Sequence, residues 1–478
     1  MKRKYFLGID IGTQGLRVIL ADQVGEVIVS KSKNFVLTEG FRKEQSPAMW
    51  WTDCFQLIGE IVASLPSNFD RDSIVSASVT STSGTVIPLD INHKPIHNAI
   101  MYSDPRSAEQ GKRIKKLATK YLPNGYTGFN TSSGLSKMRW YMDTFPSYVE
   151  QIGLWVHASD FIVGNLSGNY RVTDYTNALK SGYDLDNLVW PAYIFEKVGL
   201  RKEWMQEVVP SGSVVGRLTK ELAEYWGIPT IEIVVGITDG CASQIASGAV
   251  NPGDWNTTIG TTLVIKGVTK NQVIDPLGRL YNHRHPEGYW MPGGASNTGA
   301  DWISLDFEAD LTALNVAAEK MIPTGLLAWP LKQKGERYPI IAPQAEAIVP
   351  ETSAESQRYA ANLEGVAFIE RLAYEIISEL SGEKLSVLYT AGGGSNSDVW
   401  LTIRSAVLGV PIYKCKETSG AFGAAIMAAS QTYYNSLTEA AKRMSVIEKT
   451  VQPNQELMIA YDDQYRLFKE KLRTLKYI

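Results

Sequence analysis

The sequence predicts a layered α/β protein built from two related domains. Short apolar runs that suit strands alternate with stretches of helical periodicity along most of the 478 residues. A glycine-containing turn between two such runs, Ile11-Gly12-Thr13-Gln14, recurs 248 residues later as Ile259-Gly260-Thr261-Thr262. The same short motif in the same strand-turn-strand setting, about half a chain apart, indicates a duplicated unit.

The first ninety residues illustrate the alternation. Two apolar runs flank the first turn and a third follows Val24-Gly25, which predicts an antiparallel meander of three strands. Ser46-Pro47 predicts the start of a helix, with serine as the N-cap and proline in the first turn. The strands expected in this region comprise residues 5–10, 16–22, 26–32, 73–80 and 85–90.

The composition restricts the class of function. Lys and Arg number 47 against 50 Asp and Glu, so no excess of positive charge is available to bind nucleic acid or an anionic membrane. The three cysteines lie far apart and match neither a zinc site nor a disulfide framework. The N-terminus has no signal-peptide core and no apolar window is long enough to span a membrane, so we expect a cytoplasmic protein. As a separate expectation, the protein is a monomer or a homodimer.

A domain boundary is expected near residues 245–255, where the segment SGAVNPGDW contains glycine and proline residues that interrupt helices and strands. The two domains would then comprise residues 1–248 and 249–478.

The repeated turn is a candidate phosphate site. Glycine lets the backbone adopt conformations closed to other residues, so its N–H groups can point outward at an anion. An ordinary hairpin is the alternative for one such turn, whereas two copies favour a polyphosphate held from two sides. Neither a Walker loop nor a dinucleotide fingerprint occurs in the sequence.

Asp239 is a candidate catalytic residue. It follows an apolar run that ends at Gly236 and precedes small residues that suit a closely packed helix. Ligands bind at this end of a strand in open α/β sheets. The carboxylate can cap the helix, or it can accept a proton from an alcohol that attacks a phosphate, and spacing alone leaves both open.

Three consecutive glycines in TAGGGSNSDVW, residues 390–400, stand between an apolar run and a helical stretch. Such a surface without side chains suits the approach of a planar base or a ribose, although a tight turn explains it equally well.

Taken in order, these segments resemble the FGGY carbohydrate kinases: GIDIGTQGLR, TSTSGT, MYSDPRS, TDYTNA, GITDGCASQIASG, TTIGTT, LEGVAF and TAGGGSNSDVW. The resemblance covers nearly the whole chain. It implies two ribonuclease H-like, actin-like ATPase domains with a cleft between them, the first binding the sugar and the second most of the nucleotide.

The resemblance also implies roles for individual residues. Asp239 matches the catalytic base, and both Asp10 and Asp239 are expected near Mg²⁺ and the sugar. The residues expected to bind ATP are Gly12, Thr13, Gln14, Gly260, Thr261 and Thr262 at the phosphates, and Gly393, Gly394, Asn396 and Trp400 at the adenosine.

The sugar is expected to be a ketopentose. Residues 81–85 read STSGT where D-xylulose kinases usually show Gln-Met-His-Gly, and Tyr102 stands where they show tryptophan. The pattern is similar to that of D-ribulose kinases, with Ser83 as the sugar contact. Asp104 and Arg106 can bind sugar hydroxyls or pair with each other.

Alternatives of three kinds stay open, one of which is a kinase-like protein that hydrolyses ATP weakly and acts as a sensor. Within the enzymes, D-xylulose, other ketoses or polyols such as glycerol are possible acceptors. Outside them, a nucleotide-driven binding protein of the actin or chaperone type shares the fold and both hairpins without a sugar site.

Overall fold

The computed structural model describes residues 2–123, 125–308 and 310–478. Two compact units are distinguished by their internal contacts. The first comprises Met1–Ala246, His283–Gly288 and Ser419–Ser445, and the second comprises Ser247–Asn282, Tyr289–Thr418 and Val446–Ile478. A helix late in the chain, α13 (Gly420–Thr432), therefore belongs to the first unit.

The first unit is built on a six-stranded sheet in the order β11-β12-β5-β1-β2-β3. Its first three strands form the antiparallel meander that the sequence predicts, and β5 and β12 then add in parallel. The bounds are β1 Tyr5–Gly12, β2 Gly15–Asp22, β3 Val27–Asn34, β5 Ile74–Ser81, β11 Val214–Arg217 and β12 Glu232–Val234.

The second unit repeats this topology in a seven-stranded sheet, β15-β16-β14-β13-β17-β18-β19. The strands β13, β14 and β16 are an antiparallel meander, β17 pairs in parallel with β13, and β18 pairs in parallel with β17. The duplication predicted from the repeated turn is confirmed. The bounds are β13 Trp255–Ile259, β14 Leu263–Gly267, β15 Tyr281–Arg284, β16 Trp290–Ala295, β17 Leu388–Ala391, β18 Ile412–Cys415 and β19 Ile447–Val451.

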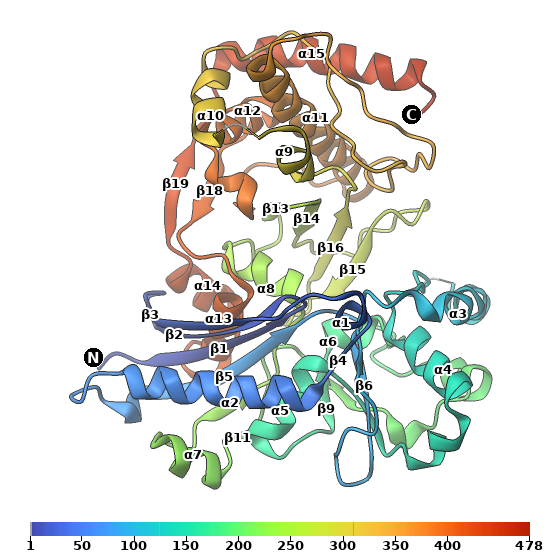
Figure 1. Ribbon diagram of the computed structural model, residues 1–478, viewed down its shortest axis with the longest axis vertical. Helices are drawn as coiled ribbons and strands as arrows, with labels where there is room; N and C mark the ends of the chain where they lie inside the picture. Colours follow the sequence, from blue (N-terminus) through green and yellow to red (C-terminus); the bar gives the residue numbers. More distant parts are fainter. Residues whose placement is uncertain (1, 124, 309) are drawn as a thin grey trace. The chain divides into compact units, whose positions relative to one another are not determined.

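The two faces of the first sheet carry different helices, α2 (Pro47–Ser64) with α5 (Ala158–Ser167) on one and α13 on the other (Figure 1). Side chains alternate along a strand, so Leu7 and Ile9 of β1 join the core formed with α2 and α5, while Gly8 faces α13. A Cβ on Gly8 would overlap the carbonyl oxygen of Ala421. Glycine therefore lets α13 lie directly on β1, on the same side as Asp10.

The helix start expected at Ser46-Pro47 is confirmed. The Ser46 hydroxyl accepts a hydrogen bond from the Met49 N–H at 3.3 Å, and Pro47 is the first residue of α2. The strand expected at residues 85–90 is also present, as β6 (Val86–Leu89), but it lies in a separate sheet of order β4-β7-β6-β8. Gly84, with φ at +85°, lies at the change of direction between β5 and β6.

The other elements of the first unit are α1 Glu39–Lys43, β4 Glu44–Gln45, β7 Ala99–Ile100, α3 Ala108–Tyr121, α4 Gly134–Thr144, β8 Leu154–His157, β9 Val172–Asp174, α6 Tyr175–Leu179, β10 Glu207–Val209, α7 Lys220–Trp226, α8 Asp239–Ala246 and α14 Leu437–Met444. Those of the second are α9 Asp301–Asp306, α10 Leu311–Glu319, α11 Glu355–Ser381, α12 Asp398–Leu408 and α15 Gln455–Thr474.

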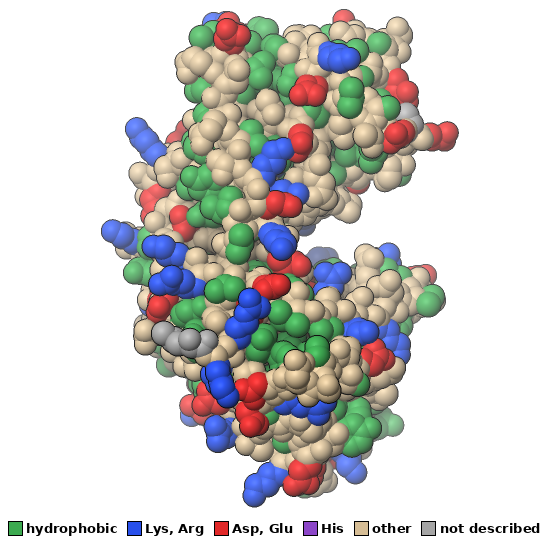
Figure 2. Space-filling model, turned by 90° about the vertical axis from the view of Figure 1, so that its left-hand side faces the viewer, with side chains coloured by type: hydrophobic (Ala, Val, Ile, Leu, Met, Phe, Trp, Pro, Cys, Tyr) green, Lys and Arg blue, Asp and Glu red, His purple; other side chains and the backbone are tan. Residues whose placement is uncertain are grey.

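Basic and acidic side chains are interspersed on the face drawn in Figure 2. Within the described ranges, no helix has both the length and the apolar character needed to cross a membrane.

Candidate active site

Two carboxylates of the first unit, Asp10 and Asp239, influence each other. Asp10 lies on β1, and its Oδ1 is buried with no hydrogen-bond partner among the described residues. Burial, and to a smaller extent the charge of Asp239, raise the pKa of Asp10 to about 7, and Arg17 acts in the opposite direction. An unsatisfied buried carboxylate oxygen is costly unless a ligand completes the site.

The start of α13 borders this carboxylate. A Cβ added to Gly420 would lie 2.6 Å from Asp10 Oδ2, so only glycine leaves the carboxylate room. The Ser419 hydroxyl caps the helix by accepting the Phe422 N–H at 3.3 Å. Residue spacing in the sequence contains no signal that Gly420 adjoins Asp10.

Asp239 is the first residue of α8, directly after the turn that follows β12, as the sequence predicts. Its Oδ1 accepts the Gly240 N–H at 2.6 Å. The turn before it is held closely, because the Thr80 hydroxyl donates to Ile237 O and the Thr238 N–H donates to the Thr176 hydroxyl at 2.8 Å. Asp239 is thus presented by a rigid segment.

The donor set fits a magnesium ion that is shared with a substrate. No cluster of three or more His, Cys, Asp and Glu occurs in the described part of the chain, so a cage made only of protein ligands is not present there. Mg²⁺ needs one or two carboxylates and keeps water and phosphate oxygens as its other ligands. The orphaned Asp10 oxygen beside Asp239 meets that requirement.

The hairpin turn after β1 is held through its carbonyl groups. Thr13 O accepts a hydrogen bond from Gln45 Nε2 at 3.1 Å, and Gln14 O accepts the Phe35 N–H at 2.8 Å. Gly12 pairs with Gly15 across the turn. Gln14 is exposed, and Gly12 and Thr13 are partly exposed.

Ser83 lies in the turn between β5 and β6. Its hydroxyl oxygen is buried, and the described residues offer it no hydrogen-bond partner. The neighbouring Gly84 packs so closely on Ser132 O that a Cβ there would overlap it. The donor and acceptor capacity of this hydroxyl is therefore unused among the described residues.

Asp104 and Arg106 are bound to each other, one of the two arrangements left open by the sequence. Arg106 Nε and Nη2 donate to Asp104 Oδ2 at 2.9 and 2.7 Å, and Nη2 also donates to Glu44 Oε1 at 2.5 Å. The guanidinium lies 4.2 Å from the ring centre of Trp140. This fork-like pairing makes a stiff element beside β4 and α4.

Lys137 is a buried cation that sequence reasoning missed. Its Nζ donates to Thr131 O and, at 3.4 Å, to Tyr102 O. Burial lowers the pKa of Lys137 to about 7, with Asp104 opposing the change and Lys180 adding to it. The ammonium thus ties α4 to the segment that carries Asp104.

The glycine turns of the second unit lie against each other. Gly392 has φ at +82°, and a Cβ on it would approach Ile259 O to 2.5 Å, while a Cβ on Gly394 would approach the Ile259 side chain to 2.8 Å. In contrast, a Cβ on Gly260 or Gly393 would meet nothing within 4 Å. The structure therefore brings the β13–β14 turn beside the 3₁₀ turn Gly393–Asn396, with open space at the partly exposed Gly260 and at the exposed Gly393.

The residues around this turn have distinct surroundings. Asn396 is exposed, as is Thr261, whereas Thr262 is partly exposed. Trp400 is buried, and its indole N–H donates to Leu363 O at 3.0 Å, so it supports Gly394 from the core side.

Asn315 is a further residue that the sequence did not single out. Its Oδ1 accepts the Ser397 hydroxyl at 2.6 Å and the Tyr359 hydroxyl at 3.2 Å. Ser397 is the N-cap of α12. Asn315 therefore ties α10 and α11 to the end of the glycine turn.

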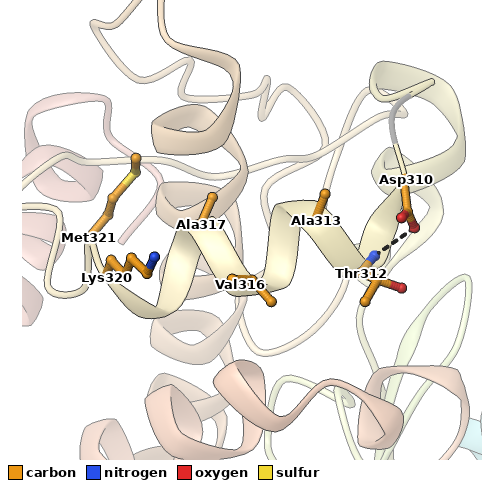
Figure 3. A pocket seen from close by; sticks show the side chains of 7 residues that line it. All are labelled: Asp310, Thr312, Ala313, Val316, Ala317, Lys320 and Met321. Atoms are coloured by element: carbon orange, nitrogen blue, oxygen red, sulfur yellow. Dashed lines mark hydrogen bonds between the residues drawn. The ribbon is translucent and has the colours of Figure 1, made fainter.

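A surface pocket of about 510 Å³ lies along α10, where Asp310 caps the helix by accepting the Thr312 N–H at 2.9 Å (Figure 3). Its other lining residues are Ala313, Val316, Ala317, Lys320 and Met321. It contains none of the residues singled out from the sequence.

Comparison with known proteins adds independent findings. Residues 5–246 match the FGGY family of carbohydrate kinases, N-terminal domain, and residues 255–432 match the C-terminal domain of the same family. A gluconokinase from Bacillus licheniformis is 26% identical over 422 residues, which cover 83% of this chain and 81% of that enzyme. A xylulose kinase from Staphylococcus epidermidis is 25% identical over 497 residues, which cover 100% and 98%. The solved structure of a ligand-bound xylulose kinase from Lactobacillus acidophilus superimposes with a TM-score of 0.86 at 20% identity and covers 99% and 98% of the two chains.

Proposed function

The chain belongs to the FGGY family of carbohydrate kinases, ATP-dependent enzymes that phosphorylate a sugar hydroxyl, and on this premise we propose that its acceptor is the terminal hydroxyl of D-ribulose. The observation that carries the choice is the buried Ser83 hydroxyl, which has no hydrogen-bond partner among the described residues. A small hydroxyl at the pocket wall suits a pentulose hydroxyl, whereas the Met-His pair typical of D-xylulose kinases presents another shape. D-Xylulose is the alternative acceptor, because similar chains are named xylulose kinases.

In the proposed reaction, Asp239 accepts the proton of the attacking hydroxyl, and its fixed position at the start of α8 orients that hydroxyl. Asp10 and Asp239 are the proposed holders of Mg²⁺, which when bound supplies positive charge to the phosphoryl oxygens. Most of the acceleration then comes from positioning and from groups that stabilise the spreading charge.

The proposed nucleotide contacts are backbone groups at turns that leave open space. Gly260 and Gly393 have room where a side chain would stand, which lets a phosphate or a ribose approach the main chain. The proposed ATP site comprises Gly12, Thr13, Gln14, Gly260, Thr261, Thr262, Gly393, Gly394, Asn396 and Trp400, the last of these from the core side.

The function is tested by coupled ADP release with Mg-ATP against a panel of ketopentoses, aldopentoses, gluconate and polyols. We expect ADP release that depends on sugar and is fastest with D-ribulose. Equal release with and without every compound would contradict the kinase, and a clear preference for D-xylulose would overturn the choice of acceptor.

Replacing Ser83 by alanine is expected to raise the KM for the sugar by about fivefold and to leave the KM for ATP unchanged, since one hydrogen bond of about 1 kcal/mol is lost. Ser78→Ala is the matched control, because the Ser78 hydroxyl on β5 is also buried without a partner among the described residues. An unchanged sugar dependence in Ser83→Ala removes Ser83 from the pocket.

Gly393→Ala is expected to fold normally and to raise the KM for ATP by about tenfold or more, which corresponds to about 1.4 kcal/mol. The added methyl group meets no atom of the described residues within 4 Å, so any effect reports on a bound ligand. Gly40→Ala, where the nearest atom is 3.9 Å away, is the control in the first unit. If the KM for ATP of Gly393→Ala equals that of the wild type, the nucleotide does not bind at Gly393.

A further inference from the structure

A fully buried carboxylate, Asp174, organises the inside of the first unit. It caps α6, since Oδ2 accepts the Thr176 N–H at 2.8 Å and Oδ1 accepts the Asn177 N–H at 3.2 Å. Side chains add further donors, namely the hydroxyls of Ser211 at 2.6 Å and Thr176 at 2.7 Å and the Asn177 amide at 2.6 Å. Burial raises the pKa of Asp174, and the hydrogen bonds from Ser211 and Thr176 oppose that change. Five donors on one carboxylate define the orientation of each donor closely.

The Thr176 hydroxyl links Asp174 to the turn that precedes Asp239 through two hydrogen bonds. A hydroxyl has one proton to donate, and the proton of Thr176 is committed to Asp174. Its free lone pair accordingly accepts the Thr238 N–H at 2.8 Å. Thr238 directly precedes Asp239, so the peptide that leads into α8 is attached to the buried carboxylate through one hydroxyl.

A second branch leads toward Ser83. The Asn177 amide donates to the Ser159 hydroxyl at 3.1 Å, and the Ser159 N–H donates to the Ser81 hydroxyl at 2.9 Å. Ser81 is the last residue of β5, and it also forms a bridge with Thr238. The same network thus holds the strand end before Ser83 and the turn before Asp239.

We propose that Thr176, oriented by Asp174, is a positioning residue that sets the place of Asp239 for proton transfer. The inference rests on the proposed function of Asp239. A general base must lie within hydrogen-bond reach of the attacking hydroxyl, and a displacement of about 1 Å can cost roughly 10²-fold in rate. The Thr176 hydroxyl acts on the turn before Asp239 by accepting the main-chain N–H of Thr238.

The Thr173 hydroxyl provides a control, because it is also a buried threonine hydroxyl but contacts other residues. The Thr173 hydroxyl contacts His157 Nδ1 at 3.1 Å, and that ring nitrogen also contacts Asp160 Oδ2 at 2.8 Å. Thr173 is as fully buried as Thr176. Thr173→Val therefore removes one buried hydroxyl, as Thr176→Val does, but it leaves the hydrogen bond to the Thr238 N–H in place.

The test compares Thr176→Val, Thr176→Ser and Thr173→Val in the full chain. Thr176→Val is expected to lower kcat for sugar-dependent ADP release by about 10- to 100-fold with the KM for ATP unchanged. Thr176→Ser, which keeps the hydroxyl, and Thr173→Val are expected to stay within about threefold of wild type. Wild-type kcat in Thr176→Val, or no recovery in Thr176→Ser, overturns the proposal.

Hydrogen exchange separates this proposal from the proposed function. The peptide covering residues 236–241 is expected to exchange faster in Thr176→Val than in wild type, Thr176→Ser or Thr173→Val, because the Thr238 N–H loses its acceptor. If the wild type shows no sugar-dependent turnover, the proposed function fails, while unchanged exchange in Thr176→Val overturns the relay. If Thr176→Val does not fold, Thr176→Ala takes its place. Alanine also removes the hydroxyl but puts no methyl group in its position, and the same fall in kcat and the same faster exchange are expected.

Discussion

Asp239→Ala is expected to lower kcat for sugar-dependent ADP release by at least about 10²-fold, with little change in ATP binding. Loss of a general base removes about 10²- to 10⁴-fold, and the loss appears in kcat because the group acts in the transition state. We expect this loss because Asp239 is held in a defined position at the start of α8, where its Oδ1 accepts the Gly240 N–H. Steady-state kinetics with ATP and D-ribulose, together with a separate ATP-binding measurement, check this result.

Asp310→Ala is the matched control for this variant. Asp310 is also a carboxylate at the start of a helix, and it caps α10 through the Thr312 N–H at 2.9 Å. Its removal is expected to cost helix stability of about 1 kcal/mol without a change in kcat. A collapse of ATP affinity in Asp239→Ala would show that Asp239 acts mainly as a structural or metal-binding residue.

Glu370→Met is expected to destabilise the second unit by about 3–5 kcal/mol, the cost of leaving one charge of a buried pair without its partner. Glu370 and Arg404 are both fully buried, and their two hydrogen bonds measure 2.7 and 2.8 Å. Arg404 also donates to the Thr390 hydroxyl at 2.8 Å, on the strand that leads into the glycine turn. Denaturant unfolding followed by tryptophan fluorescence measures the loss, because several tryptophans lie in this core.

Two controls define the origin of that loss. Lys449→Ala breaks an exposed pair with Asp398, whose side chains are 39% and 76% exposed, and is expected to cost less than about 1 kcal/mol. Replacing both Glu370 and Arg404 by methionine is expected to recover much of the stability, since no unpaired charge remains. If Glu370→Met and Lys449→Ala lower the free energy of unfolding by the same amount, the prediction is contradicted.

Local chemistry explains the parts of the fold that the sequence predicts well. The meander from β1 to β3 follows from alternating apolar residues and glycine turns, and α2 follows from Ser46 and Pro47. Asp239 stands at the start of a helix because its neighbours in the chain determine that start. The repeated Ile-Gly-Thr turn predicts the repeated topology for the same reason.

Contacts between distant segments explain what the sequence left open. Spacing allowed Asp104 and Arg106 to bind a sugar or each other, and their geometry in the folded chain pairs them. The approach of Gly420 to Asp10 joins residues 410 positions apart, which no local pattern records. The relay from Asp174 to Thr238 likewise joins two segments whose hydrogen-bonding groups meet only after folding.

The sequence by itself determined the α/β class, the duplication, the candidate carboxylates and the glycine turns, because these depend on residue type, period and short-range order. Only the tertiary structure decided which polar groups are satisfied inside the protein, such as Asp174, and which have no hydrogen-bond partner among the described residues, such as Ser83 Oγ and Asp10 Oδ1. Burial and hydrogen-bond partners are properties of packed neighbours that come from remote parts of the chain. A buried polar atom without a partner is therefore visible in the folded structure alone.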